Sequence, residues 1–235
     1  MALNEEDILR RYAAAAEAAH AELTELDQLS GDGDFGDNLR NGLRDAVSAY
    51  EKSGGSALRV LGEVFLDEVG GTSGPLLGLL FTEIARAHEE PATARAQGEQ
   101  ATTREHEEQV TAHAQEEPAT DPAAAWAAGT AAGLAAIQRV GEAAVGDRTL
   151  VDALAPAVEA LRRGGENVFS AAAEAAGDGA ARTAEMRARM GRASYVGDRA
   201  KGAPDPGAMG VALLFWVVAT VADPRADLRP PLASV

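Results

Sequence analysis

The sequence predicts an all-α fold, and three observations support this prediction. Apolar residues recur at spacings of three and four along most of the chain, which places them on one face of a helix. Capping residues and first-turn prolines precede several of these stretches. No stretch shows the sustained apolar–polar alternation of a half-buried strand. Together these patterns indicate eight helices and no strand.

The first half of the chain predicts four helices. Asn4 can cap the first, whose apolar face runs from Ile8 to Leu26. Breaks rich in glycine and serine follow the second and third helices, and Pro75 stands where a first-turn proline begins the fourth. The expected ranges are 4–26, about 37–52, about 57–69 and 75–84.

The second half predicts four more helices. Asp-Pro pairs at 121–122 and 205–206 mark the start of the fifth and the eighth, and residues 149–152 have capping-box spacing before the sixth. Gly129 and Gly133 in the fifth helix permit close approach to a neighbouring helix, because glycine has no Cβ. The expected ranges are about 122–140, 149–163, 166–190 and 206–222.

Residues 88–121 differ from the rest of the chain. They contain nine acidic residues and two arginines, hence seven of the sixteen net negative charges, and almost no large apolar side chain. Three of the four histidines also lie here, but a solvated run fits them better than a metal site. We expect an exposed acidic excursion between the fourth and fifth helices, on an otherwise single domain of residues 1–235.

Composition narrows the classes of function. The 235 residues are enough for one sizeable core, and the net charge of −16 argues against binding nucleic acid or an anionic membrane surface. The absence of cysteine fits a reducing cytoplasm, and the acidic N-terminus does not resemble a signal peptide. The longest apolar run, 208–222, is shorter than the roughly 20 residues of a membrane span. We therefore expect a cytoplasmic protein whose last helix is buried in the core.

Residues 26–38 form the most unusual stretch of the chain, because carboxylates and glycines alternate in it. The carboxylates are those of Asp27, Asp32, Asp34 and Asp37. Such oxygen ligands on a flexible loop suit Mg²⁺ or Ca²⁺. An EF-hand is excluded, since Leu43 stands where the bidentate glutamate would be required. A solvated acidic turn is the alternative that spacing alone leaves open.

Four glycine-bearing loops follow the first, third, fifth and seventh helices, at residues 26–38, 70–75, 141–149 and 191–207. If consecutive helices are antiparallel, these loops all open at one end of the bundle. That end would combine carboxylates for a cation, a helix start at Thr72 and Ser73 for an anion, and an arginine. The combination is typical of a magnesium–phosphate site, where phosphoryl transfer needs positioning and charge neutralisation rather than a protein nucleophile. No Walker or kinase-type glycine loop is present.

Four motifs, in this order, resemble the nucleotide-binding (DhaL-type) subunit of dihydroxyacetone kinases. They are Leu26–Gly36, Gly70–Leu76, Gly146–Leu154 and Gly191–Ala208. The resemblance covers nearly the whole chain except 88–121. It implies an antiparallel eight-helix barrel that holds ADP or ATP and two Mg²⁺ in a pocket at one end.

The resemblance also implies roles for individual residues. The implied magnesium ligands are Asp27, Asp32 and Asp34. The implied nucleotide contacts are Phe35, Gly36, Asp37, Asn38, Thr72, Ser73, Gly141, Leu150, Arg192, Asp205, Pro206 and Gly207. Among them, Arg192 is expected to stabilise charge on the transferred phosphoryl group. Phe35 stands where some members have histidine, and Leu150 stands where methionine is common.

In this family a separate subunit or domain holds the sugar. The resemblance therefore implies a phosphotransferase subunit that passes phosphoryl to dihydroxyacetone or a related short ketose on a ketose-binding partner subunit. The phosphoryl source is ATP in one version and a phosphotransferase-system protein fed from phosphoenolpyruvate in the other, and these residues do not distinguish them. A non-catalytic ADP-binding regulator is the alternative function, and the assembly is expected to be a homodimer or a heteromer.

Overall fold

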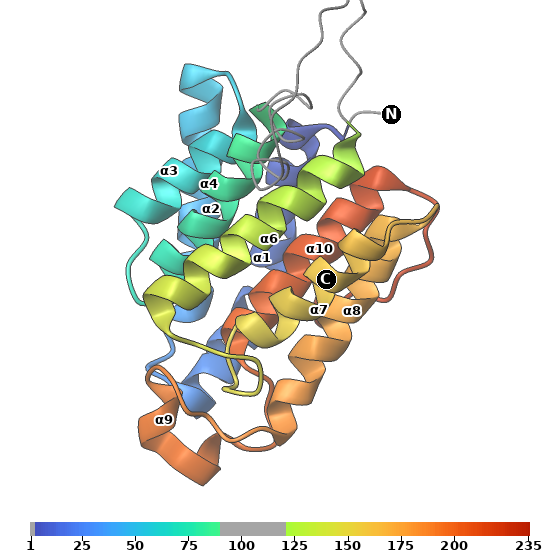
Figure 1. Ribbon diagram of the computed structural model, residues 1–235. Coiled ribbons are helices and arrows are strands. Elements are labelled where there is room, and N and C mark those ends of the chain that lie inside the picture. The colour runs from blue at the N-terminus through green and yellow to red at the C-terminus, as the bar shows by residue number, and fades with distance from the viewer. Residues whose placement is uncertain (1–2, 90–120) are drawn as a thin grey trace, which may run out of the picture.

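The computed structural model describes residues 3–89 and 121–235, and within these ranges every regular element is a helix. The long helices are α1 (Glu5–Ser30), α2 (Phe35–Ser53), α3 (Ala57–Asp67), α4 (Ser73–Glu89), α6 (Pro122–Gly141), α7 (Val151–Arg163), α8 (Val168–Arg182) and α10 (Pro206–Ala222) (Figure 1). A short helix α9 (Ala193–Val196) and the 3₁₀ turns η1 (Thr183–Glu185) and η2 (Gly197–Ala200) lie between α8 and α10. The all-helical prediction is confirmed for the described residues.

Helices that follow one another in the chain pack side by side, from α1 on α2 through to α7 on α8. The last helix, α10, contacts α8 and α7 and also returns to α1. Figure 1 shows α9 at one end of the bundle, beside the connections that enter and leave it. The whole connection from α8 to α10 therefore includes a part that lies at that end of the bundle.

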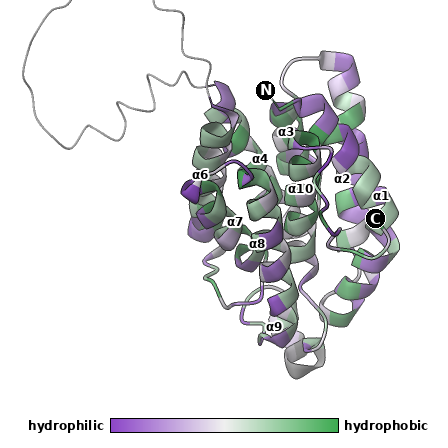
Figure 2. Ribbon diagram, turned by 90° about the vertical axis from the view of Figure 1, so that its right-hand side faces the viewer, coloured by the Kyte–Doolittle hydropathy of each residue, from purple (hydrophilic) through white to green (hydrophobic). Residues whose placement is uncertain are grey.

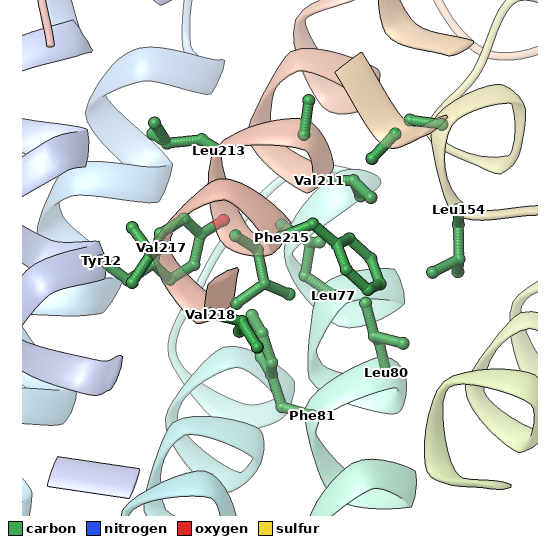
Figure 3. Close-up of a cluster of buried hydrophobic side chains, with 14 of the residues drawn as sticks. Tyr12, Leu77, Leu80, Phe81, Leu154, Val211, Leu213, Phe215, Val217 and Val218 are labelled. Carbon is green, nitrogen blue, oxygen red and sulfur yellow. The ribbon is translucent and has the colours of Figure 1, made fainter. Parts of the chain in front are cut away.

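The core is built around α10. Thirteen of its seventeen residues are buried, and Figure 3 shows Phe215 and Val218 among Leu77, Leu80 and Phe81 of α4. In Figure 2, α10 is mainly hydrophobic, whereas the helices around it carry hydrophilic residues as well. The expectation that the last apolar run is a buried core helix is confirmed. Within the described residues, no helix is both long and apolar enough to cross a membrane.

One polar group is buried in this core with a partner. The hydroxyl of Tyr12 on α1 donates to the carbonyl of Gly210 on α10 at 2.9 Å. The bond satisfies a hydroxyl that would otherwise be costly to bury. Burial also raises the pKa of Tyr12, because the phenolate would be poorly solvated. The ring of Tyr12 packs edge-on against that of Phe81 at 6.3 Å.

The predicted close approach at Gly129 and Gly133 is present between α6 and α4. A Cβ at Gly129 would lie 2.5 Å from Ile84 Cα, and one at Gly133 would lie 2.7 Å from Leu80 Cδ1. Neither position has room for a side chain, so the two helices pack nearly backbone to backbone.

The predicted caps at Asn4, Asp121 and Asp205 are confirmed, whereas α7 begins at Val151 after Leu150, whose side chain forms no cap bond. Asn4 Oδ1 accepts from the backbone of Glu6 at 3.0 Å. Asp121 caps α6, with its Oδ1 accepting from the backbone of Ala123 at 3.0 Å. Asp205 Oδ2 accepts from the backbone of Ala208 at 2.9 Å and starts α10. These bonds satisfy amides that a helix leaves free at its start.

The structure differs from the expected seventh helix, which was predicted to run to residue 190. Helix α8 ends at Arg182 because the next two residues bond to the segment before α10 instead. Thr183 Oγ1 accepts from the backbone of Asp205 at 2.7 Å, and the Ala184 carbonyl accepts from Gly202 at 2.9 Å. Apart from residues 88–89 and 121, the expected acidic excursion lies outside the described residues.

Candidate functional site

One pocket is lined by residues from all four of the glycine-bearing loops. Thirteen of the residues that the resemblance implies contribute to its wall: Asp27, Asp32, Asp34, Phe35, Asn38, Thr72, Ser73, Gly141, Leu150, Arg192, Asp205, Pro206 and Gly207. These residues are separated by up to about 180 positions in the sequence, and the helix packing brings them to the same place. Gly36 and Asp37 do not line the pocket.

Gly36 and Asp37 have close contacts elsewhere. A Cβ at Gly36 would overlap Thr24 Oγ1 and would lie 2.7 Å from the His20 carbonyl, so this glycine allows α2 to cross close to α1. The carboxylate of Asp37 accepts from Arg40 Nη2 at 2.7 Å and lies 2.9 Å from His20 Nε2. Their contact with a nucleotide stays a prediction.

Residues 26–38 are here called the acidic loop, and its three remaining aspartates have different partners. Asp27 Oδ2 accepts from the backbone of Phe35 at 3.0 Å, which folds the loop back onto the end of α1. The carboxylate of Asp32 forms an ion pair with Arg192. Asp34 precedes α2 without capping it through its side chain. Gly33 has φ 86°, a left-handed conformation that favours glycine and allows the turn between Asp32 and Asp34.

These carboxylates suit a magnesium ion by their chemistry but are not gathered around one point. Within residues 3–89 and 121–235, no group of three His, Asp or Glu side chains is placed to hold a metal ion. The three aspartates nevertheless line the same pocket, and hard carboxylate oxygens are the donors that Mg²⁺ prefers. The donor set therefore fits magnesium shared with a phosphate better than an all-protein metal cage.

Another part of the pocket wall, the start of α4, offers donors to an anion. Helix α4 begins at Ser73, directly after Thr72, and both residues line the pocket. The first backbone N–H groups of a helix have no partner within it, and the helix dipole favours negative charge there. A phosphate between this helix start and the acidic loop would meet N–H donors on one side and a carboxylate-bound cation on the other.

The inner part of the pocket is apolar. Phe35, Leu77, Ile137 and Leu150 line it and are largely buried. A Cβ at Gly207 would lie 3.5 Å from Leu150 Cβ, so the turn at 205–207 approaches this wall closely. Such a surface suits a flat aromatic base rather than a second charged group.

Asp205 joins the turn to the rest of the site. It caps α10 and is enclosed enough that burial raises the pKa of its carboxyl to about 6, although Arg148 nearby acts in the opposite direction. The residues at 205–207 are therefore held by the helix cap and by the bond from the Asp205 backbone to Thr183.

Residues 146–152 form a tight loop organised by one carboxylate. Asp152 Oδ1 accepts from the backbone of Gly146 at 2.5 Å, and its Oδ2 accepts from that of Thr149 at 2.9 Å. Arg148 in this loop also lines the pocket and is only 1% exposed. Sequence reasoning assigned no role to Arg148. The place of this arginine inside the matched Gly-Asp-Arg-Thr motif was the signal that could have identified it.

A protein-family model described as the DAK2 domain matches residues 29–220. Two similar proteins are the ADP-binding subunits DhaL of phosphoenolpyruvate-dependent dihydroxyacetone kinases. The subunit of kinase 1 from Listeria innocua is 32% identical, over 82% of this chain and 83% of that protein. The Escherichia coli subunit is 33% identical, over 85% of this chain and 87% of that protein.

Larger proteins match through part of their length. L-erythrulose 1-kinase of Mycolicibacterium smegmatis is 32% identical, over 83% of this chain but 31% of that kinase. The crystal structure of the dihydroxyacetone kinase from C. freundii in complex with AMP-PNP and Mg²⁺ superposes with a TM-score of 0.64 and 26% identity, over 92% of this chain and 33% of that kinase. The chain thus spans most of the separate subunits and about a third of these larger kinases.

Proposed function

The chain belongs to the DAK2-domain family, and we propose that it is the nucleotide-binding, phosphoryl-transfer subunit of a kinase for dihydroxyacetone or a related short ketose. One observation carries the proposal: a single pocket combines three aspartates, the start of α4, an apolar wall and Arg192. In the same proposal, residues 1–235 are one domain whose long helices form an antiparallel barrel open at the pocket. The contacts that run from α1 through α8 and return from α10 to α1 support this arrangement.

The proposed roles follow from the position of each group. Asp27, Asp32 and Asp34 would hold two Mg²⁺, which neutralise the charge of the ADP or ATP phosphates. Thr72, Ser73 and the first amides of α4 and of α2 would bind the phosphate oxygens. Leu150, Gly141 and the turn at 205–207 would hold the base and sugar.

Arg192 would act on the transferred phosphoryl group. Its guanidinium reaches the acidic loop, as its ion pair with Asp32 demonstrates. A positive charge that can move between a carboxylate and a phosphate oxygen stabilises the charge that develops during transfer. The ketose would be held by a separate partner subunit, and the phosphoryl source would be ATP or a phosphoenolpyruvate-fed donor protein.

Thermal unfolding with and without Mg-ADP tests the binding step. Mg-ADP should raise the melting temperature of the parent protein, and Asp32→Asn should lose most of that rise, because a ligand stabilises only the state that binds it. Asp37→Asn is the matched control: it makes the same change five residues away, on a carboxylate that contacts His20 and Arg40 and does not line the pocket. Equal shifts in all three proteins would contradict the proposed site.

Turnover tests the transfer step. The chain should support ketose phosphorylation when mixed with its cognate ketose-binding subunit, and should not do so alone. Binding of Mg-ADP without turnover with any such subunit would indicate a non-catalytic regulator instead.

A further inference from the structure

Arg148 is the most deeply buried charged side chain in the pocket wall, and its contacts lie far away in the sequence. Its Nη2 donates to the carbonyl of Ala200 at 2.9 Å and to that of Ala203 at 3.0 Å. The backbone of Arg148 has φ 61°, a left-handed conformation that a residue with a Cβ adopts only at a cost in free energy. The surrounding structure therefore holds this arginine in an unfavourable backbone conformation, with its side chain across the 200–203 stretch.

The preceding residue holds the other end of the same stretch. The carbonyl of Asp147 accepts from the backbone of Arg189 at 3.1 Å, and its Oδ1 lies 3.4 Å from Arg189 Nη1. Residues 189–203, here called the Arg192 segment, are thus fastened near both ends by two consecutive residues. The bonds of Gly202 to Ala184 and of Asp205 to Thr183 add to the second attachment.

Between these attachments, the Arg192 segment contacts the rest of the protein through Met190, which packs against the core, and through the buried Ala193. It crosses the acidic loop, where Arg192 pairs with Asp32. Tyr195 in α9 is 91% exposed. The position of Arg192 over the pocket therefore depends on how the ends of the segment are held, together with the packing of Met190 and Ala193.

Packing alone does not explain a charged side chain at position 148, because burying the charge costs desolvation free energy. Its Nε and Nη1 are buried and have no hydrogen-bond partner among the described residues. Burial lowers the pKa of the guanidinium and the carboxylate of Asp205 acts against this, but an arginine stays protonated in either case. An apolar side chain of similar volume would avoid the desolvation cost of the buried charge.

We infer that Arg148 is a positioning residue, which fixes the Arg192 segment over the acidic loop by binding the carbonyl groups of Ala200 and Ala203. It acts through Arg192, and through the turn at Asp205 that follows the segment. The inference rests on the proposed function, because the purpose of the fixed position is contact with the nucleotide phosphates.

Limited proteolysis of the ligand-free protein tests the attachment itself. Arg148→Met removes the two hydrogen bonds and keeps much of the side-chain volume. Trypsin should then cut the Arg192 segment at least about tenfold faster. The two bonds from the charged guanidinium keep the segment attached, and their loss should let it detach locally more often. Arg162→Met is the control: it removes an arginine of α7 that is exposed and pairs only with Glu159 among the described residues. A cutting rate in Arg148→Met equal to that of the parent and the control would overturn the inference.

A double-mutant cycle tests whether Arg148 acts through Arg192. With the cognate ketose-binding subunit, Arg148→Met should lower kcat and leave the KM for the ketose unchanged, because the ketose is held on the partner. Arg192→Gln should lower kcat strongly in the parent but have little further effect in Arg148→Met. Effects that multiply independently would overturn the inference.

The two experiments separate this inference from the proposed function. The proteolysis uses neither nucleotide nor partner. Failure of the parent to bind Mg-ADP would reject the proposed function before any variant is compared. Normal binding and turnover of the parent, with unchanged proteolysis in Arg148→Met, would reject the role of Arg148 alone.

Discussion

Two glycines in α8, only two residues apart, should respond in opposite ways to replacement by alanine. A Cβ at Gly179 would overlap the carbonyl of Asp152 on α7 and would lie 2.9 Å from Pro156 Cγ. A Cβ at Gly177 would meet nothing within 4 Å outside its own helix. The same substitution in the same helix thus differs only in what the new methyl group contacts.

The size of each effect follows from these contacts. In Gly179→Ala the new methyl group clashes with a neighbouring backbone, and no rotamer change can relieve this clash. We therefore expect it to lower the free energy of unfolding by about 3 kcal/mol, the upper end of the range for overpacked cores. Alanine recovers about 1 kcal/mol of helix propensity, which leaves Gly179→Ala destabilised by about 2 kcal/mol. For Gly177→Ala only the propensity gain of about 1 kcal/mol remains.

Thermal unfolding measures both variants directly. For a chain of this size, these values correspond to a melting temperature about 4–8 °C lower in Gly179→Ala and about 2–4 °C higher in Gly177→Ala. Gly179→Ala should also weaken Mg-ADP binding, because the displaced Asp152 organises the loop that carries Arg148 and Leu150. Shifts of the same sign in both variants would refute the close packing of α8 on α7.

Three further predictions concern the pocket. First, the carboxyl of Asp205 has a pKa of about 6 against an ordinary value of 3.8, so the folded state binds this proton more tightly than the unfolded state. The protonated carboxyl adds up to about 3 kcal/mol to the free energy of unfolding. This stabilisation is fully present below pH 3.8 and is lost as the pH rises through about 6. In Asp205→Asn, the free energy of urea unfolding should therefore depend less on pH over this range. Second, Gly36→Ala should lower the melting temperature equally with and without Mg-ADP, because its Cβ would collide with α1 rather than with the ligand. Third, Arg192→Gln should lower kcat about 10²–10³-fold with the partner subunit, but leave the melting temperature nearly unchanged because its pair with Asp32 is half exposed.

Each of these predictions has a contrary outcome. An unaltered pH profile in Asp205→Asn would place the titrating group elsewhere. A loss confined to the Mg-ADP-bound form of Gly36→Ala would mean that the added Cβ disturbs the bound ligand rather than the packing of α2 on α1. A large fall in melting temperature for Arg192→Gln would mean that the ion pair supports the fold.

Much of the fold was predictable because the signals that specify it are local. The caps at Asn4, Asp121 and Asp205 bond to backbone amides two or three residues away, so the sequence around each one is sufficient to recognise it. The apolar face of a helix is likewise visible within a few turns. The density of aspartate and glycine in 26–38 also marked the acidic loop without knowledge of its neighbours.

The wrong end of the seventh helix, and the contacts that the sequence left open, arose where distant residues compete with local preference. Helix α8 stops at Arg182 because Thr183 and Ala184 bond to residues about 20 positions later, although the sequence remains alanine-rich. Asp37 matches the other loop aspartates in type and spacing, but α1 supplies His20 as its partner. Neither partner can be inferred from a window of neighbouring residues.

The sequence by itself determined an all-helical chain, the caps that start α1, α6 and α10, and a loop rich in carboxylates, because each depends on residues within about four positions of one another. Only the tertiary structure decided which carboxylates enter the pocket, and that Arg148 spans to carbonyl groups 52 and 55 residues away. Those outcomes depend on how closely the helices can pack, since that packing alone brings the ends of separate helices within hydrogen-bonding distance.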